Sequence, residues 1–474
     1  MAIRGNGGSR SPLRPAQARS LRLRGTRLSG PQGNPMTLGM SLGLAAAAIV
    51  LAAAFVTSET SITRQAKADR VTVVYWEKWT GSEGEEMAKV VSAFNRSQDR
   101  IFVKILSISG VDQKTMLATA GGNPPDVAGL WGNNVTQLAD ANAVTDLTEL
   151  ARAAGVTEDQ YIPGYWDGLT YHGKLWALPS TPASMAMHVN ADLVPKEFAT
   201  AETFPQTFKA LDALVDKISK KDKAGTLTMT GFLPGEPGWW HWAWGYWFGG
   251  RLIEGDRLTI NAPENVRALE WIAGYGKRFG VSQMQSFQSG FGNFASPQDA
   301  FMTGKVASQL HGVYKANYIR LYKSDLNWFA LPFPHPDDRP DLAGQTIIDQ
   351  DVLMIPRGAK HPKEAFEFIR FVQRQDVMEG LCAAHGKNSP LMAVSEGFLK
   401  DHPNKEIRLF DRLARDPKAF HTPKIGIFNQ ISSEMSVAYQ EVSGGQKSAK
   451  QALDDAQSRL EGLWRIYQDQ VLKP

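Results

Sequence analysis

Short apolar segments alternate with amphipathic segments from residue 71 onward, and this pattern limits the possible folds more than any other feature. The apolar segments are Val71 to Trp76, Ile101 to Ile108 and Asp126 to Trp131. The first is almost continuously apolar, as expected of a parallel strand buried on both faces. Each segment is followed by a loop and then by residues with apolar side chains at helical spacing. Strands that alternate with helices predict an α/β fold with a parallel sheet.

The length of the chain predicts two domains, because 474 residues are too many for one compact core. Two short apolar segments surround Ser180-Thr181-Pro182, and a proline-rich stretch covers residues 332–340. Proline-rich breaks of this kind separate structural units. We therefore expect a first lobe from residues 69–180 and 344–419, and a second lobe from residues 181–343 and 420–474.

The first 68 residues have the character of an export leader. Residues 1–35 are rich in Arg, Gly and Ser, and residues 38–56 are uncharged and mostly apolar. A basic segment followed by an apolar one indicates an export signal. The apolar run is also long enough to span a bilayer, so cleavage after Ala68 and retention as a transmembrane anchor both stay open. Translation could begin at Met1 or at Met36. In either case we expect a periplasmic or extracytoplasmic protein.

Charge and cysteine content exclude several classes of function. Residues 1–68 hold nine Lys or Arg and one acid, and the remainder holds 43 basic and 47 acidic residues, a net charge of −4. A body with this balance has no electrostatic signature for nucleic acid. Cys382 is the only cysteine, so no internal disulfide forms. No Cys and His cluster has metal-ligand spacing, and we expect neither a metal nor a cofactor.

A tryptophan-rich stretch from Leu233 to Gly250 holds five of the 13 Trp residues of the chain. The residues just before it, Thr226 to Phe232, alternate in character and predict a strand. Gly235-Glu236-Pro237 ends that strand, and the proline suits the first turn of a following helix. The aromatic residues would thus open a helix at the carboxyl end of a strand. In α/β sheets ligands bind at this position.

The aromatic side chains of this stretch are too numerous for one buried helix face. We predict that Trp239 and Trp240, next to the glycine-containing loop, stack on a ligand, with the Glu236 carboxylate beside them. A sugar, which has a flat apolar face and a hydroxylated rim, suits such a surface. Packing is the simpler interpretation for the others, since large aromatic residues dominate protein cores: Trp244, Trp247 and Phe248.

Several segments occur in an order that resembles a known family. They are VYWEKWTG, AFNRSQ, AGGNPPDVAGLWG, YHGKLWALP, SMAMHVN, FPQTF, FMTGKVASQLHG and DVLMIPRGAKHPKEAFEFIRFV. Their order over residues 70–440 resembles the extracellular solute-binding proteins, family 1, of ABC importers, in the sugar-binding branch that includes maltose-binding protein. The resemblance implies a periplasmic-binding-protein fold, with two α/β lobes, crossing hinge strands and a ligand cleft between the lobes. It also implies an ABC permease as partner, and we expect a monomer.

The resemblance and the strand-end loops together indicate a set of ligand-binding residues. Glu77, Lys78, Asn133 and Asn134 follow the first and third strands, where the family contacts sugar hydroxyls, and Glu236 matches a sugar-binding glutamate. Where maltose-binding protein has an acidic residue this chain has Ala183, so the ligand need not be maltose. The full predicted set is Trp76, Glu77, Lys78, Trp79, Trp131, Asn133, Asn134, Glu236, Trp239, Trp240, Tyr314 and Asp351.

Some of these assignments have structural alternatives. Trp76 and Trp131 end strands and suit either a core or a cleft wall, and Tyr314 suits either a core or a stacking position. Glu77 and Lys78 could form a solvated ion pair of little energetic weight.

Two functions are the main alternatives at this point, since a third, a membrane-anchored sensor domain suggested by the long apolar run, needs a signalling partner that this chain lacks. The first is a non-catalytic binding protein that delivers a carbohydrate to a permease. The alternative is a secreted or anchored glycoside hydrolase, which would use Glu236 with a second carboxylate such as Glu77 or Asp351. No motif for a nucleophile elbow, a phosphate-binding loop or a zinc protease is present in the sequence. We therefore favour the binding protein.

Overall fold

The computed structural model describes residues 70–236 and 238–472. Residues 69–474 form one compact unit. The predicted leader, residues 1–68, and the question of its cleavage lie outside the described residues. Among the helices of the described part, none is both long and apolar enough to cross a membrane.

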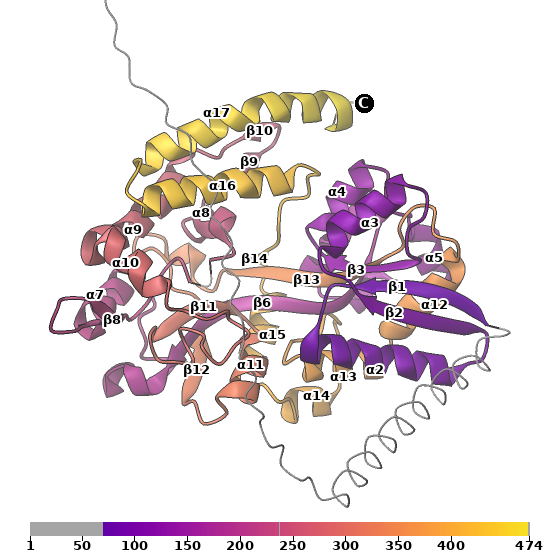
Figure 1. Cartoon of the computed structure of the whole chain (residues 1–474), viewed down its shortest axis with the longest axis horizontal. Coiled ribbons are helices and arrows are strands. Elements are labelled where there is room, and N and C mark those ends of the chain that lie inside the picture. Colours follow the sequence, from indigo (N-terminus) through magenta and orange to yellow (C-terminus); the bar gives the residue numbers. More distant parts are fainter. Residues whose placement is uncertain (1–69, 237, 473–474) are drawn as a thin grey trace, which may run out of the picture. The chain divides into compact units, whose positions relative to one another are not determined.

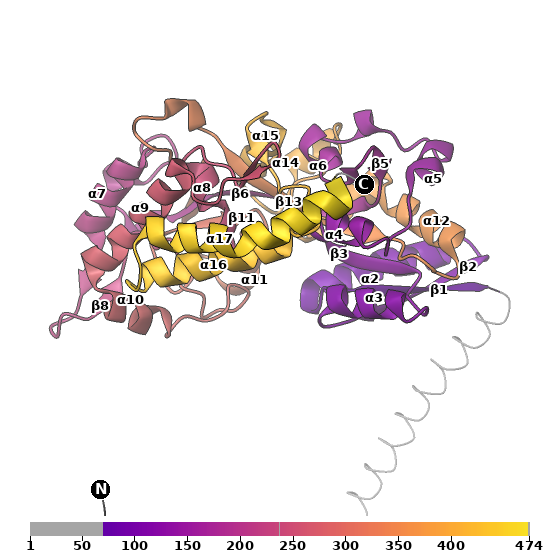
Figure 2. The same cartoon turned by 90° about the horizontal axis from the view of Figure 1, so that it is seen from above.

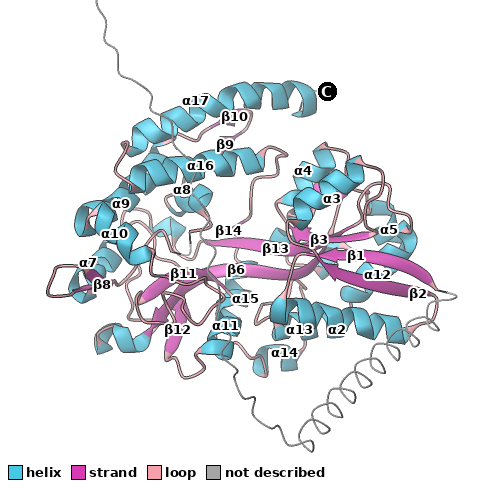
Figure 3. Cartoon of the chain, viewed as in Figure 1, coloured by secondary structure: helices cyan, strands magenta, loops and turns pink. Residues whose placement is uncertain are grey.

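A sheet of eight strands forms the centre of this unit, with the order β11-β6-β13-β3-β1-β2, and with β12 beside β6 and β14 beside β13. Figure 3 shows these strands between helices on both sides. Their bounds are β1 (Val71–Glu77), β2 (Ile101–Ser107), β3 (Val127–Trp131), β6 (Leu178–Asn190), β11 (Ser308–Gly312), β12 (Trp328–Leu331), β13 (Thr346–Met354) and β14 (Ala419–Phe420). Six strands of two or three residues form separate pairs: β4 (Thr170–Tyr171) with β5 (Lys174–Leu175), β7 (Lys220–Lys221) with β8 (Leu227–Met229), and β9 (Ile253–Glu254) with β10 (Arg257–Leu258).

The first three strands are parallel, as the alternation of strands and helices predicts. Strand β1 pairs with β2 from Val71 opposite Ile101 onward, and with β3 at Tyr75 opposite Val127. The helices that connect or cover them are α2 (Gly81–Ser97), α3 (Val111–Ala120), α4 (Asn134–Asp140), α5 (Thr148–Ala153), α6 (Pro163–Asp167), α12 (Pro362–Val372) and α13 (Gln375–Ala384). Because parallel strands end at the same edge of a sheet, the loops after β1 and β3 lie close together.

Two long strands, β6 and β13, run through both halves of the sheet (Figure 1). They pair antiparallel with each other, and the register shifts between Asp351 and Val352 of β13. Strand β13 also pairs with β3, whereas β6 pairs with β11 and β12. The sequence predicts a strand pair over residues 345–356, but the segment is a single strand. These two crossing strands join the two lobes.

Two hydrophobic cores lie on either side of the crossing. The first core draws on residues 73–178 and 352–398, and the second on residues 183–347 and 407–467. Residues 407–413, which the sequence assigns to the first lobe, contribute Ile407, Phe410 and Leu413 to the second core. The residue ranges assigned to the two lobes otherwise stay a prediction.

The second half of the chain is mostly helical. Besides α12 and α13, the helices from residue 208 onward are α7 (Phe208–Ile218), α8 (Trp244–Trp247), α9 (Pro263–Phe279), α10 (Val281–Gln288), α11 (Lys315–Tyr322), α14 (Glu396–Lys400), α15 (Ile407–Arg415), α16 (Phe428–Ser443) and α17 (Ala449–Tyr467). Figure 2 shows α16 and α17 side by side along the molecule, with the end of α17 near α4. The hydroxyl of Tyr467 donates a hydrogen bond of 2.7 Å to Asp140 of α4. The last helix therefore contacts both halves.

The tryptophan-rich stretch differs from its prediction. The strand before it, β8, is only three residues long, and α8 is preceded by a 3-10 turn over His241–Ala243. Trp239 and Trp240 therefore lie in the loop before the helix, and not on the helix. Trp244, Trp247 and Phe248 are buried in the second core, as the sequence predicts.

Candidate functional site

The principal cavity lies where the loops after β1 and β3 meet the crossing strands. It has a volume of about 410 Å³, within the range typical of small-molecule sites. Both lobes contribute to its wall, as expected at the carboxyl ends of parallel strands. The residues that line it are Trp79, Glu83, Trp131, Thr181, Ala183, Met185, Trp239, Trp240, Phe294, Tyr314, Tyr318, Asp349, Gln350, Asp351 and Lys387.

A buried charge network around Asp351 forms one side of the cavity. Its Oδ2 accepts hydrogen bonds from Lys387 Nζ at 2.8 Å, Thr181 Oγ1 at 2.8 Å and Trp79 Nε1 at 3.2 Å. The Nζ of Lys78 lies 3.3 Å from its Oδ1. Burial opposes ionisation of Asp351, but the charges of Lys387 and Lys78 outweigh it and hold the pKa of this carboxyl well below its usual value. The group is therefore a fixed anion that orients both lysines and Trp79.

Two further carboxyl groups line the cavity, and within the described residues neither forms an ion pair. Burial raises the pKa of Asp349 to about 6, although its Oδ1 accepts a hydrogen bond of 2.8 Å from the backbone N–H of Gln350. Burial also raises the pKa of Glu83, and Tyr318 donates a hydrogen bond of 3.1 Å to this carboxyl. These groups offer acceptors to a ligand, and they make the site unfavourable for an anion.

Glu77 does not line this cavity, contrary to its predicted role in ligand contact. It is completely buried, and its Oε1 accepts the backbone N–H groups of Lys78 at 2.7 Å and Trp79 at 3.0 Å. Its Oε2 accepts the hydroxyl of Tyr75. A side chain at Gly129 would collide with that oxygen, at 2.6 Å from the added Cβ. Glu77 thus shapes the loop that presents Trp79.

Lys78 and Trp76 are not among the residues that line the cavity. The Nζ of Lys78 is 5.3 Å from the centre of the Trp79 ring and 5.6 Å from that of the Trp131 ring. This places the ammonium group behind the two tryptophans, where cation–π attraction adds to its ion pair with Asp351. Trp76 packs against the first core. Of the two interpretations that the sequence leaves open for Trp76, the structure matches the core.

Aromatic rings form most of the remaining wall. Trp79 and Trp131 belong to the first lobe, and Trp239, Trp240 and Tyr314 to the second. Trp239 is 40% exposed and makes edge-on contacts with Trp240, at 5.5 Å between ring centres, and with Phe294, at 4.4 Å. Such edge-on packing leaves ring faces available for stacking on a ligand. Five of the six predicted tryptophan and tyrosine positions are thus brought together around one cavity.

Glu236 is not among the residues that line the principal cavity. Its Oε1 accepts a hydrogen bond of 3.2 Å from Gln309 Nε2. Burial, together with the charge of Asp299, raises the pKa of Glu236 to about 7, and Lys315 opposes the change. Lys315 and Asp299 form a fully buried ion pair at 2.6 Å. The carboxylate therefore belongs to a polar cluster behind the Trp239–Trp240 loop.

The two predicted asparagines are adjacent in the sequence, but their side chains have different surroundings. Asn133 lines a second cavity of about 200 Å³, which shares Trp239, Trp240 and Asp349 with the principal one. Asn134 is buried, and its Oδ1 accepts the backbone N–H of Trp131 at 3.2 Å. Asn134 therefore holds the loop that carries Trp131.

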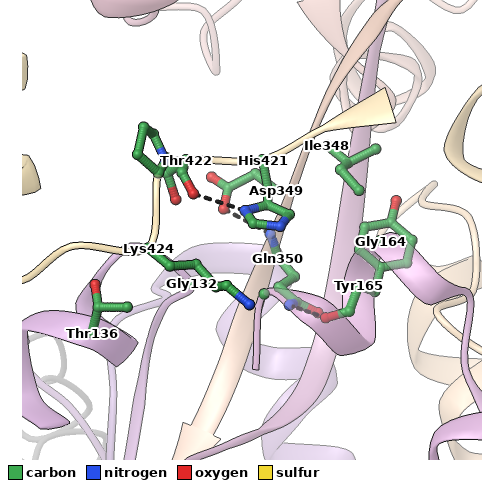
Figure 4. A pocket seen from close by; sticks show the side chains of 12 residues that line it. Gly132, Thr136, Gly164, Tyr165, Ile348, Asp349, Gln350, His421, Thr422 and Lys424 are labelled. Carbon is green, nitrogen blue, oxygen red and sulfur yellow. Dashed lines mark hydrogen bonds between the residues drawn. The ribbon is translucent and has the colours of Figure 1, made fainter. Parts of the chain in front are cut away.

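A much smaller cavity also borders β13, and it shares Ile348, Asp349 and Thr422 with the cavity of about 200 Å³ (Figure 4). Its volume of about 20 Å³ is enough for little more than one water molecule. Beside it Asp167 bonds to His421 at 2.7 Å and to Lys424 at 2.5 Å. This cavity is a feature of the interlobe crossing and is too small for a solute.

Nine residues that line the principal cavity are absent from the predicted set: Glu83, Thr181, Ala183, Met185, Phe294, Tyr318, Asp349, Gln350 and Lys387. The position of Glu83 in the sequence could have marked it as a cavity residue, since it lies in the first turn of the helix after β1. Phe294 and Lys387 lie in irregular segments, and only the tertiary structure brings them to the cavity. Among the described residues, no group of three or more His, Cys, Asp or Glu side chains could hold a metal ion.

This architecture defines a two-lobed binding-protein fold with its cavity between the lobes. The model for the bacterial extracellular solute-binding protein family matches residues 89–403, and the chain belongs to this family.

Curated relatives match most of the chain. The sn-glycerol-3-phosphate-binding periplasmic protein UgpB of Pectobacterium atrosepticum is 22% identical over 426 residues, which are 84% of this chain and 92% of the relative. An uncharacterised ABC transporter extracellular-binding protein of Pyrococcus horikoshii is 23% identical over 334 residues, which are 67% of this chain and 72% of the relative.

Solved structures share the fold. The mannotriose complex of CpMnBP1 has a TM-score of 0.74 at 23% identity and covers 83% of this chain and 100% of its own. The sugar-binding protein MalE of Xanthomonas citri has a TM-score of 0.69 at 18% identity, with coverages of 85% and 100%. The GacH receptor of Streptomyces glaucescens, solved unliganded and with acarbose, has a TM-score of 0.67 at 18% identity, with coverages of 84% and 99%.

Proposed function

We propose that this solute-binding protein captures an uncharged carbohydrate in the principal cavity and delivers it to the membrane permease of an ABC import system. One observation carries the choice of ligand: tryptophan rings from both lobes surround a cavity that also holds carboxylate acceptors. A sugar presents apolar ring faces to such rings and hydroxyl donors to such carboxylates. The mannotriose and acarbose complexes of proteins with this fold are consistent with that chemistry.

The charges of the site favour a neutral sugar over a phosphorylated solute, although UgpB relatives are named for sn-glycerol 3-phosphate. Phosphate sites depend on free cationic or N–H donors. Here Lys78 and Lys387 are both paired with Asp351. Asp349 and Glu83 also line the cavity, and either carboxyl would repel a phosphate dianion when it is ionised.

Ligand capture would proceed by closure of the two lobes. A ligand between Trp131 of one lobe and Trp240 of the other contacts both rings only when the two lobes are closed. It therefore shifts the population toward the closed state in proportion to those added contacts. The crossing strands β6 and β13 are the elements about which the lobes would move.

We further propose that the protein acts as an exported monomer without catalysis. The proposed hydrolase alternative loses its support, because Glu236 is bonded to Gln309 and Glu77 accepts backbone N–H groups. Asp351, the other candidate, is held ionised by two lysines. Incubation with chromogenic glycosides is expected to release no chromophore. N-terminal sequencing of the exported protein tests the leader, and a start near Asp69 would support cleavage.

The carbohydrate proposal is tested by calorimetric titration with a panel of neutral mono- and oligosaccharides and with sn-glycerol 3-phosphate. We expect binding of at least one neutral sugar, together with a rise in the melting temperature, since a ligand of the folded state stabilises it by mass action. Binding of sn-glycerol 3-phosphate with no binding of neutral sugars would refute the proposal.

A further inference from the structure

Three cavities adjoin one another along the interlobe cleft. The principal cavity, here called the inner chamber, shares Trp239, Trp240 and Asp349 with the cavity of about 200 Å³, here called the middle chamber. The middle chamber shares Asn429 with a third cavity of about 350 Å³, the outer chamber. The outer chamber lies between α3, α4 and the start of α16. The cleft thus extends well beyond the aromatic site.

A chain of amide side chains separates the middle and outer chambers. Asn429, near the start of α16, accepts a hydrogen bond of 3.0 Å from Asn133 Nδ2 at its Oδ1. Its own Nδ2 donates a bond of 2.9 Å to Gln137 Oε1. Asn133 lines the middle chamber and Gln137 lines the outer one, while Asn429 lines both. The side chain of Asn429 is therefore held by two bonds to the first lobe at the boundary between the chambers.

The inner and middle chambers differ in chemistry. The inner chamber is walled by aromatic rings, which suit the apolar face of a sugar. The middle chamber adds amide and hydroxyl groups at Asn133, Thr422, Asn429 and Ser432. Such groups both donate and accept hydrogen bonds, and they match the hydroxyls of a further sugar unit. Its volume is about half that of the inner chamber, so the additional space is limited.

We propose that the ligand is an oligosaccharide with at least two sugar units, one in the inner and one in the middle chamber, and that Asn429 limits its length. The amide chain Asn133–Asn429–Gln137 bars the ligand from the outer chamber. This inference rests on the proposed carbohydrate function and adds the size of the ligand and the residue that sets it. Without the Asn429 side chain, the middle and outer chambers would join.

The test compares chain-length series on the full exported protein. Calorimetric titrations use mannose, mannobiose, mannotriose and mannotetraose, and also glucose, maltose, maltotriose and maltotetraose. In at least one series, the wild-type protein is expected to bind the disaccharide at least about tenfold more tightly than the monosaccharide, because the second unit adds contacts in the middle chamber. Longer members of that series are expected to bind with no further gain.

The variant Asn429→Ala is expected to extend the gain in affinity to the next longer sugar, by at least about tenfold. Ser432→Ala is the matched control, since Ser432 lines the middle chamber one helical turn away but does not line the outer one. It is expected to leave the length limit unchanged. If Asn429→Ala does not fold, Gln137→Ala removes one of the two bonds that hold Asn429 and is expected to extend the limit in the same direction.

The outcomes separate the two proposals. Equal affinity for monosaccharide and disaccharide in every series that binds would overturn the length inference and leave the carbohydrate function standing. The same conclusion follows if Asn429→Ala and Ser432→Ala give the same length profile. Absence of binding by all eight sugars, in a protein that is folded by its melting curve, would count against the carbohydrate function itself.

Discussion

Substitution of Asp351 by Asn is expected to lower the free energy of unfolding by about 3–5 kcal/mol, the cost of leaving a buried charge without its partner. The change keeps the shape of the side chain and one acceptor oxygen for Thr181 and Trp79. It removes the negative charge that pairs with Lys387 at 2.8 Å and with Lys78 at 3.3 Å, and it leaves Lys78 only the Glu77 carboxylate, 3.7 Å away. The side chains of both lysines are no more than 3% exposed, so solvent cannot replace the lost charge.

The assay is equilibrium unfolding in urea, which does not screen charge, followed by tryptophan fluorescence. Asp338→Asn is the control, because Asp338 also forms a two-bonded ion pair, with Arg267, but the two side chains are 61% and 46% exposed. That change is expected to cost no more than about 1 kcal/mol. The double variant Asp351→Asn with Lys387→Met is expected to be more stable than Asp351→Asn alone, since one unpaired charge is removed.

Equal losses of stability in Asp351→Asn and Asp338→Asn would refute the reasoning. Such a result would mean that the lysines behind Trp79 and Trp131 reach solvent or another anion. The network would then contribute no more than a surface ion pair, and it would not explain the positions of Trp79 and Trp131.

Three further predictions concern single groups. Trp240→Ala is expected to weaken sugar binding by about 1–3 kcal/mol with the melting temperature nearly unchanged, whereas a loss of melting temperature at unchanged affinity would place this ring in the core. Burial raises the pKa of Glu236 to about 7 from its ordinary value of 4.5, so its contribution to stability is complete below about pH 4.5 and is lost as the pH rises through 7. Glu236→Gln should therefore gain about 3 kcal/mol of stability relative to wild type between pH 4.5 and 8, measured by urea unfolding, and a difference independent of pH would contradict this. Cys382 is completely buried and its pKa is raised by burial, so it should not react with a thiol reagent until the protein unfolds, and rapid labelling of the native protein would show otherwise.

Local patterns in the sequence were sufficient to locate the three parallel strands along the chain. The apolar segments at β1, β2 and β3 and the helical stripe of α2 depend on near neighbours, and these elements form where they were predicted. The helix expected to begin at Pro237 was harder to place, since α8 begins only at Trp244. Trp239 is held by contacts with Phe294 and His311, which the local pattern does not contain.

The types of residue in the site were predictable, but their roles were not. Both Glu77 and Asp351 were predicted as ligand-binding residues and as candidates for a second catalytic carboxylate. In the structure Glu77 accepts hydrogen bonds from two backbone N–H groups of its own loop. Asp351 instead forms ion pairs with two lysines from other segments of the chain. Whether a carboxylate faces its own backbone or a cavity depends on which donors are brought to it.

The sequence by itself determined the alternation of strands and helices, the aromatic character of the site and the family, because each depends on the kinds and order of residues along the chain. Only the tertiary structure decided which side chains share the cleft. Lys387 meets Lys78 across Asp351, and Asn429 meets Asn133, over separations of hundreds of residues. Contacts of that range are selected by the packing of the two lobes about β6 and β13, since no periodicity within one segment encodes its distant partner.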